Sequence, residues 1–176
     1  ALPIFYVLGT SRAFDFPVDP LPPQIRYVGP QLDEPAWARA WTPPWPRTDR
    51  RPLVAVGFST TFQNHSHVLQ SVVDAAGALP VRTFVTLGQI SPDEVRGAAN
   101  TVVVPSAPHD AVMGEASVVV THGGHGTVMR ALMHHRPLLI IPHGRDQHEN
   151  AIRVTERGAG LCLPATASRE EIQHAL

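Results

Sequence analysis

Six short apolar runs, separated by segments with helical patterns, start at Leu53 and continue toward the end of the chain. The runs are rich in Val and Ile without strict alternation, a pattern typical of strands in a parallel sheet that is covered on both faces. The runs are Leu53–Phe58, Val81–Leu87, Thr101–Val104, Ser117–Thr121, Pro137–Ile141 and Gly160–Leu163. Strand–helix units of this kind predict an α/β fold, a Rossmann-like, doubly wound parallel sheet of about six strands.

The segments between the runs carry helix signals. Ser91-Pro92-Asp93-Glu94 is a capping box with proline at the first helical position, which predicts a helix start. One apolar helical stripe consists of Val68, Leu69, Val72, Val73 and Ala76. Further helices are predicted over residues 109–115, 126–135, 147–157 and 169–176.

Residues 9–52 have a different texture, dominated by proline. Proline lacks an amide donor and restricts the residue before it, so a regular helix or a central strand is not expected here. Aromatic residues such as Trp37, Trp41 and Trp45 argue against a disordered linker. We therefore predict that residues 1–52 are an ordered interdomain arm at the end of an N-terminal domain. Residues 53–176 would be a C-terminally truncated domain, and the chain a piece of a longer protein.

Composition excludes several classes of protein. The formal net charge of −1 does not suggest a nucleic-acid surface, and no apolar run reaches the roughly 20 residues that cross a bilayer. Cys162 is the single cysteine, so there is no internal disulfide, and we expect a cytoplasmic protein. All 14 basic residues are arginines, which excludes Walker-type and Schiff-base lysines and suggests a GC-rich, actinobacterial source.

The segment after the fourth run carries the strongest functional signal. A strand is predicted to end at Thr121, followed by the turn His122-Gly123-Gly124-His125-Gly126 and by a helix that begins near Thr127. Glycines let backbone amides approach an anion, and a helix start adds unpaired N–H groups and the positive end of the dipole. Thr127 adds a hydroxyl, and His122 adds an imidazole that can donate to a phosphate. A plain turn would need only the glycines, so the segment favours an anion site.

Two other loops are predicted at the same edge of the sheet, where ligands of such folds bind. Asp146 and Gln147 follow the fifth run at a helix start. Asp146 is either an N-cap or, together with Gln147, a ligand for vicinal sugar hydroxyls, and the residues alone leave both interpretations open. Ser59 and Thr60 follow the first run and either contact phosphate or serve as ordinary turn residues.

The histidines raise the alternative of a metal site. Zinc sites need three or four ligands in a fixed geometry, and neither an HExxH signature nor a cysteine pair is present. Gly123 and Gly124 place His122 and His125 on a turn, so helix-face spacing does not apply to this pair. No metal and no other cofactor is expected.

The run THGGHGTVMRALMHHRPLLIIPHGRDQHENA, from Thr121 to Ala151, resembles the signature of UDP-glycosyltransferase-like enzymes, especially bacterial macrolide and antibiotic glycosyltransferases. Upstream, VGFSTTF, SAPHDAVM and LPPQIRYVGP are similar to the first-strand loop, the nucleotide-side loop and the segment that enters the donor domain. The resemblance covers nearly the whole chain. It implies the C-terminal half of a GT-B fold, which binds the nucleotide sugar, whereas an N-terminal domain binds the acceptor.

The resemblance also implies a role for each candidate residue. Asp146 and Gln147 would hold the sugar hydroxyls, and His109 would lie beside the nucleoside. The donor phosphates would be held by His122, Gly123, Gly124, His125, Gly126 and Thr127, with Ser59 and Thr60 approaching from the first loop.

The implied reaction is an inverting transfer of a sugar from UDP or TDP to a hydroxyl of a small natural-product acceptor. Helix-dipole and hydrogen-bond contacts, instead of a metal, would stabilise the leaving diphosphate. The catalytic base would come from the N-terminal domain, so none is named in this chain. The fragment alone is expected to be inactive.

Two positions depart from the family pattern. Arg130 stands where many relatives carry a glutamate that accepts from ribose hydroxyls, and Ser106 stands where several carry a tryptophan that stacks on the base. An arginine cannot accept a hydrogen bond, so ribose recognition must differ, and the choice between uridine and thymidine stays open. The alternatives are a non-catalytic nucleotide-sugar-binding module and a nucleotide-sugar epimerase of similar fold.

Overall fold

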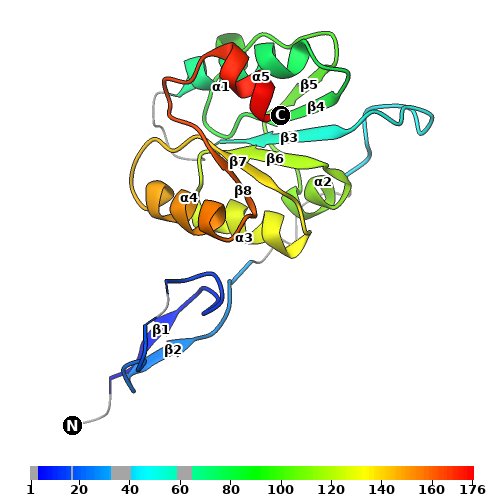
Figure 1. Ribbon diagram of the computed structural model, residues 1–176. Coiled ribbons are helices and arrows are strands. Elements are labelled where there is room, and N and C mark those ends of the chain that lie inside the picture. The colour runs from blue at the N-terminus through cyan, green and yellow to red at the C-terminus, as the bar shows by residue number, and fades with distance from the viewer. Residues whose placement is uncertain (1–3, 17, 33–40, 59–64) are drawn as a thin grey trace. The chain divides into compact units, whose positions relative to one another are not determined.

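The structure, a computed structural model, describes residues 4–16, 18–32, 41–58 and 65–176 (Figure 1). The chain forms two compact units, Ala1–Asp33 and Glu34–Leu176. The first contains two short parallel strands, β1 (Tyr6–Leu8) and β2 (Ile25–Tyr27). Strand β2 lies within the proline-rich stretch, but no proline occurs between Pro23 and Pro30, so its amides are free to pair.

The second unit is built on one six-stranded parallel sheet, in the order β5-β4-β3-β6-β7-β8 (Figure 1). The strands are β3 (Leu53–Gly57), β4 (Arg82–Thr86), β5 (Thr101–Val104), β6 (Val118–Thr121), β7 (Leu138–Ile140) and β8 (Gly160–Cys162). This order is that of a Rossmann-like doubly wound sheet, and it confirms the predicted fold class. The direction of winding reverses between β3 and β6, which makes that junction the switch point of the sheet.

Helices cover both faces of this sheet (Figure 1). They are α1 (Ser66–Gly77), α2 (His109–Glu115), α3 (His125–Met133), α4 (Gln147–Glu156) and α5 (Arg169–Ala175). The α1 helix packs on α5, and its apolar stripe is buried with Val54 and Val56 of β3. The opposite face carries α2, α3 and α4. Alternate residues of β3 therefore point into two separate core layers.

One predicted helix start is only a single turn. The capping box at Ser91 forms as expected, but it caps the 3₁₀ turn η1 (Pro92–Glu94). The chain becomes extended at Val95, which buries its side chain against the core. Apolar periodicity does not continue beyond this residue, so packing does not support further helical turns.

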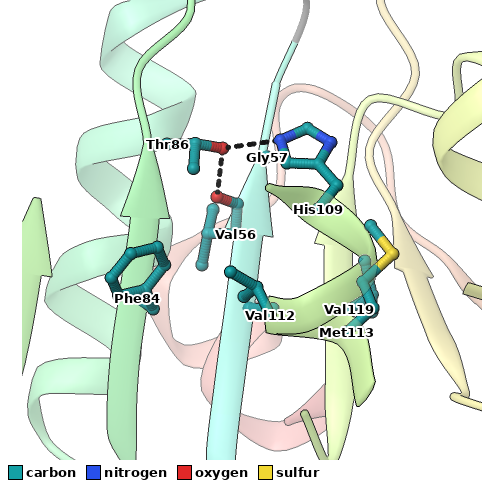
Figure 2. A pocket seen from close by; sticks show the side chains of 9 residues that line it. Val56, Gly57, Phe84, Thr86, His109, Val112, Met113 and Val119 are labelled. Atoms are coloured by element: carbon teal, nitrogen blue, oxygen red, sulfur yellow. Dashed lines mark hydrogen bonds between the residues drawn. The ribbon is translucent and has the colours of Figure 1, made fainter. Parts of the chain in front are cut away.

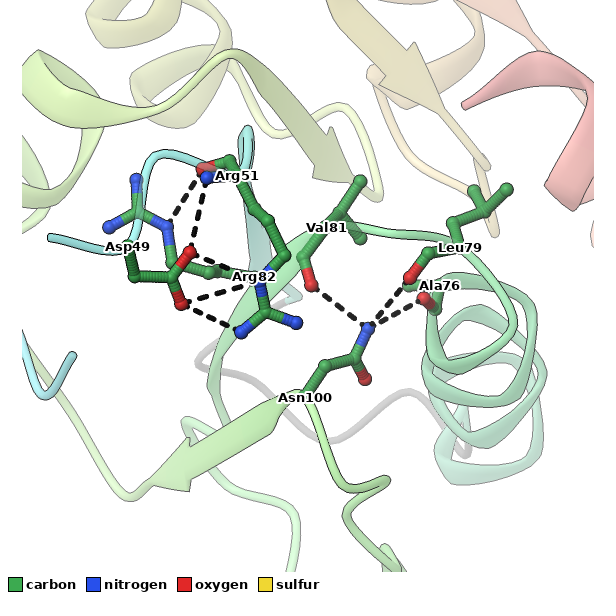
Figure 3. Close-up of polar contacts among 7 residues, drawn as sticks. All are labelled: Asp49, Arg51, Ala76, Leu79, Val81, Arg82 and Asn100. Atoms are coloured by element: carbon green, nitrogen blue, oxygen red, sulfur yellow. Dashed lines mark hydrogen bonds and ion pairs between the residues drawn. The ribbon is translucent and has the colours of Figure 1, made fainter. Parts of the chain in front are cut away.

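The edge opposite the switch point is closed by polar contacts (Figure 3). The buried Asn100 precedes β5, and its Nδ2 donates to the carbonyls of Ala76, Leu79 and Val81 at 3.0, 3.2 and 3.0 Å. These bonds satisfy the end of α1 and tie it to the start of β4. Nearby, Arg51 forms a surface ion pair of 2.7 Å with Asp49.

The aromatic residues before β3 pack on the sheet unit. The rings of Trp41 and Trp45 meet Phe84 of β4 edge-on, at centroid distances of 5.5 and 6.2 Å. The Arg82 guanidinium lies over the Trp45 ring at 5.5 Å. Trp37 lies outside the described residues.

Candidate functional site

The predicted anion-binding turn lies at the switch point. Gly57 at the end of β3 pairs with Thr121 at the end of β6. The chain after Thr121 turns at His122 and Gly123 and enters α3 at His125, two residues before the predicted Thr127. The carboxyl ends of β3, β6 and β7 therefore converge on the first turn of α3, which is where doubly wound folds bind ligands.

Gly123 and Gly124 are required by the geometry of this turn. Gly123 has a φ of +95°, and a Cβ there would lie 2.8 Å from Cγ2 of Ile140. A Cβ on Gly124, the N-cap of α3, would lie 2.6 Å from Nε2 of His122. The His122 ring edge therefore lies directly beside the start of α3. No side chain forms a capping hydrogen bond with this helix. The first amides of a helix have no intrahelical acceptors, and an anion can accept from them.

Around this helix start the predicted residues differ in exposure. Gly126 is exposed, and His125 and Thr127 are half-buried in the first turn of α3. His122 is only 8% exposed. An anion can reach the accessible first turn of α3, where the amides and the helix dipole favour negative charge and the buried imidazole lies beside them.

The His122 ring is held by backbone and side-chain groups. It donates a hydrogen bond to the Gly57 carbonyl, and its Nδ1 lies 3.4 Å from Oγ1 of Thr121. Burial lowers the pKa of His122 to about 4, and repulsion from His65 and His143 acts in the same direction. The Gly57 carbonyl and the Asp146 carboxylate oppose this shift. His122 is therefore a neutral imidazole at neutral pH.

Three imidazoles gather around Phe58, and we call His65, His122 and His143 the imidazole cluster. The centroids of the three rings lie 5.3, 6.3 and 5.8 Å, respectively, from that of Phe58, and those of His65 and His143 lie 5.2 Å apart. His65, the N-cap residue of α1, is 3% exposed. Burial lowers the pKa of His65 to about 4 and also lowers that of His143. Sequence reasoning did not single out His65, because only the packing of α1 brings it beside Phe58.

The loop between β7 and α4 joins the same site. Asp146 occupies the N-cap position of α4 but makes no capping hydrogen bond. Its Oδ2 instead accepts from Nδ2 of Asn150 at 2.9 Å, and the same Nδ2 donates to the Gly123 carbonyl at 3.0 Å. Asn150 is 4% exposed and was not predicted as a site residue. It locks the glycine turn to the carboxylate that faces solvent beside it.

Gln147 has a different environment from Asp146. It is 1% exposed, and its Oε1 accepts from the backbone amides of His143 and Gly144 at 2.7 and 3.2 Å. This oxygen therefore stabilises the conformation of the loop between β7 and α4. Asp146 is the exposed member of the predicted sugar-binding pair.

On the other side of β3, His109 begins α2 beside Thr86, and the two side chains line a small pocket (Figure 2). Nε2 of His109 lies 3.4 Å from Oγ1 of Thr86, which in turn donates to the Val56 carbonyl at 3.3 Å. The rest of the lining is mostly apolar and comes from Ala55, Val56, Gly57, Phe84, Val112, Met113 and Val119. His109 is thus a polar group in the lining of a small, mostly apolar pocket. Ser59 and Thr60 lie outside the described residues.

Arg130 forms an ion pair with α2. Its Nε lies 2.9 Å from Oδ1 of Asp110, and Nε2 of His134 lies 3.3 Å from the same oxygen. The Arg130 side chain is 11% exposed and that of Asp110 is 42% exposed. This position therefore brings a carboxylate to the surface next to His109, although the carboxylate belongs to α2.

Two further features bear on the predictions. Within the described ranges, no group of three His, Cys, Asp or Glu side chains is arranged to hold a metal ion. Among the helices of that part of the chain, none has both the length and the apolar character needed to span a bilayer.

Comparison with known proteins agrees with this architecture. Residues 53–176 match the glycosyltransferase family 28 C-terminal domain. The chain is 36% identical over 165 residues to 4'-demethylrebeccamycin synthase of Lentzea aerocolonigenes, a match that covers 92% of this chain and 38% of the synthase. It is 34% identical over 151 residues to a PGL/p-HBAD biosynthesis rhamnosyltransferase of Mycobacterium bovis, covering 84% of this chain and 32% of that protein.

Solved structures show the same fold. The glycotransferase of kitacinnamycin superposes with a TM-score of 0.83 at 23% identity, covering 96% of this chain and 44% of that one. The fold is therefore that of the C-terminal, Rossmann-like half of a GT-B protein. The chain belongs to the glycosyltransferase family 28 C-terminal domain family. Its relatives include antibiotic-type glycosyltransferases such as 4'-demethylrebeccamycin synthase. The chain spans well under half of the length of the synthase and of the rhamnosyltransferase.

Proposed function

We propose that this chain is the donor-binding domain of an inverting glycosyltransferase that uses a UDP- or TDP-sugar. The observation that carries the proposal is the buried His122 ring, fixed beside Gly124 at the uncapped start of α3. A diphosphate placed there accepts from the amides of the first helical turn, and the helix dipole favours its charge. Membership in the family supports the same assignment.

The remaining site residues fit around that diphosphate. His122, the turn Gly123–Gly124 and the first turn of α3 (His125, Gly126 and Thr127) hold the phosphates, and Ser59 and Thr60 stay predicted phosphate contacts. Asp146, exposed and oriented by Asn150, accepts from sugar hydroxyls. Gln147 supports the sugar side chiefly by holding the His143–Gly144 turn. His109 lies beside the nucleoside.

The proposed reaction takes place between this domain and an acceptor-binding domain. An acceptor hydroxyl, deprotonated by a base from that second domain, attacks the anomeric carbon. The bond to the diphosphate breaks with inversion, and the electron pair passes to the leaving diphosphate. Groups aimed at this developing charge, above all His122 and the amides of α3, lower the barrier. The acceptor is a small, natural-product-like alcohol, and the reaction is placed in the cytoplasm.

Calorimetry with uridine diphosphate and thymidine diphosphate tests the proposal on this chain. We expect at least one of them to bind with a dissociation constant below about 1 mM, which corresponds to about 4 kcal/mol of binding free energy. Uridine and thymidine are the controls and should bind much more weakly. If neither diphosphate binds at millimolar concentration, the chain is not a donor-binding domain.

A further inference from the structure

The imidazole cluster brings two additional histidines, His65 and His143, together with His122 around Phe58. His65 is 3% exposed, and neither of its ring nitrogens has a hydrogen-bond partner within the described part of the chain. Buried polar atoms normally have partners, so an unsatisfied imidazole beside the site needs an explanation.

The number of protons that the His122 ring can carry suggests a role for the cluster. A neutral imidazole carries one N–H, and the other ring nitrogen can only accept. The ring donates to the Gly57 carbonyl, which uses that single proton. To donate to an anion at the start of α3 as well, the ring must acquire a second proton and become an imidazolium.

The surroundings of the cluster decide when this second proton is stable. In the free protein, burial disfavours a charge on each of the three rings, and repulsion disfavours a charge on more than one of them at a time. The other titratable groups that face them are His67 on α1, Asp146 before α4 and His148 on α4, and of these only Asp146 favours a positive charge on His122. A bound diphosphate adds negative charge beside His122, which offsets the cost of burying the imidazolium.

We propose that the imidazole cluster is a proton-accepting part of the anion site, which takes up one proton when a diphosphate diester binds at the start of α3. His122 carries the proton toward the ligand, and repulsion from that charge keeps His65 and His143 neutral, so that the cluster takes up a single proton. This inference rests on the proposed function. It adds that the donor binds in a protonation-coupled step and assigns two further histidines to the site.

The test is calorimetry with UDP-glucose and TDP-glucose in buffers of different ionisation enthalpy. A diphosphate esterified at both ends lacks the ionisation near pH 6 of a terminal phosphate, so uptake by the ligand does not interfere. We expect uptake of close to one proton at pH 6. By linkage, the affinity should rise by up to about tenfold for each pH unit lowered between pH 7 and pH 5.

Two variants separate coupling from structure. His122→Gln keeps a neutral donor but cannot titrate, so its binding should be independent of pH, with no proton uptake. His65→Gln leaves His122 and the start of α3 in place, so uptake of close to one proton should persist. His174→Gln on the exposed side of α5 is the matched control and should behave like the unmodified chain.

The outcomes distinguish the two proposals. Binding of a nucleotide sugar with no proton uptake and a flat pH profile overturns the coupling and leaves the donor-binding function in place. Proton uptake that persists in His122→Gln also overturns it, because the proton then resides elsewhere. A failure of every nucleotide and nucleotide sugar to bind at any pH overturns both.

Discussion

The two sides of the candidate site are built in different ways. On the β6/β7 side, His122, Gly123 and Asn150 are buried, and hydrogen bonds lock the turn before α3 to the turn before α4. On the β4 side, His109 and Asp110 are only half-buried, with His109 3.4 Å from Thr86 and Asp110 paired with Arg130 and His134 at the surface. The part of the site proposed to meet the diphosphate is therefore the more tightly fixed one, which we call the rigid side. The part proposed to meet the nucleoside is assembled from side chains that can change without disturbing the core.

The largest effect is expected for Gly123→Ala on the rigid side. The residue has a φ of +95°, and its new methyl group would lie 2.8 Å from Ile140. Backbone strain and overpacking together should lower the free energy of unfolding by about 3 kcal/mol, measured by urea denaturation. Gly126→Ala is the matched control, because a Cβ there meets nothing within 4 Å. This variant should leave the free energy of unfolding unchanged or raise it. A loss equal to that of Gly123→Ala would show that the turn does not require glycine at position 123 in particular.

The next effect concerns the Asn150 bridge. Asn150→Asp replaces the donor with a carboxylate facing the Gly123 carbonyl and Asp146, so unfolding free energy should fall by about 2–3 kcal/mol. In the folded fraction, diphosphate affinity should also fall, by roughly tenfold, a drop that corresponds to a loss of about 1.4 kcal/mol.

The matched control is Asn100→Asp at the opposite edge of the sheet, where Asn100 also donates to buried carbonyls (Figure 3). It should lose similar stability, but calorimetry on the folded protein should find unchanged diphosphate affinity. Equal losses of affinity in both variants would show that Asn150 has only a general structural role.

Acid should lower the stability of the folded protein through the buried histidines of the rigid side. The pKa values of His65 and His122 are about 4 in the folded protein, below the ordinary value of 6.5. Between these values the unfolded chain binds more protons, so stability is full above about pH 7 and falls as the pH approaches 4. From pH 7 to pH 5, each imidazole should cost at most about 2 kcal/mol, visible as a falling thermal midpoint.

His65→Gln should reduce this acid sensitivity, whereas His174→Gln should leave it unchanged. A thermal midpoint that is flat from pH 7 to pH 5 would mean that the imidazoles titrate normally, and the rigid side would then be more open to water than its burial indicates.

The smallest effect is expected on the β4 side. Arg130→Gln removes a partly exposed ion pair with Asp110, and such pairs contribute about 1 kcal/mol or less. Urea denaturation should show a correspondingly small change. A loss near 3 kcal/mol would mean that this side is as tightly built as the other, and the comparison between the two sides would fail.

Sequence reasoning recovered the fold because the fold depends on local patterns. All six strands occur where apolar runs predicted them, and α2 covers the predicted residues, His109–Glu115. The glycine turn was predictable for the same reason, since its residues are adjacent in the chain. The ligand roles of these residues stay predictions.

Contacts between distant segments were not predictable. His65 lies beside Phe58, which also contacts His122, only because α1 packs on the sheet, and Asp110 meets Arg130 across two helices. Asn150 had a partial signal, since it lies four residues after Asp146 on one helix face. The single turn at Ser91 shows the converse, a local signal that tertiary packing did not extend.

The central claim is that His122 and the start of α3 hold a diphosphate, and the most direct test compares two ligands in one variant. Calorimetry should show that His122→Ala weakens binding of the preferred nucleoside diphosphate by roughly 10- to 100-fold, as expected for a charge-assisted hydrogen bond of about 1.5–3 kcal/mol. Binding of the matching nucleoside should change less than threefold, or about 0.7 kcal/mol. Equal losses for both ligands would mean that His122 only supports the fold, and that the diphosphate is held elsewhere.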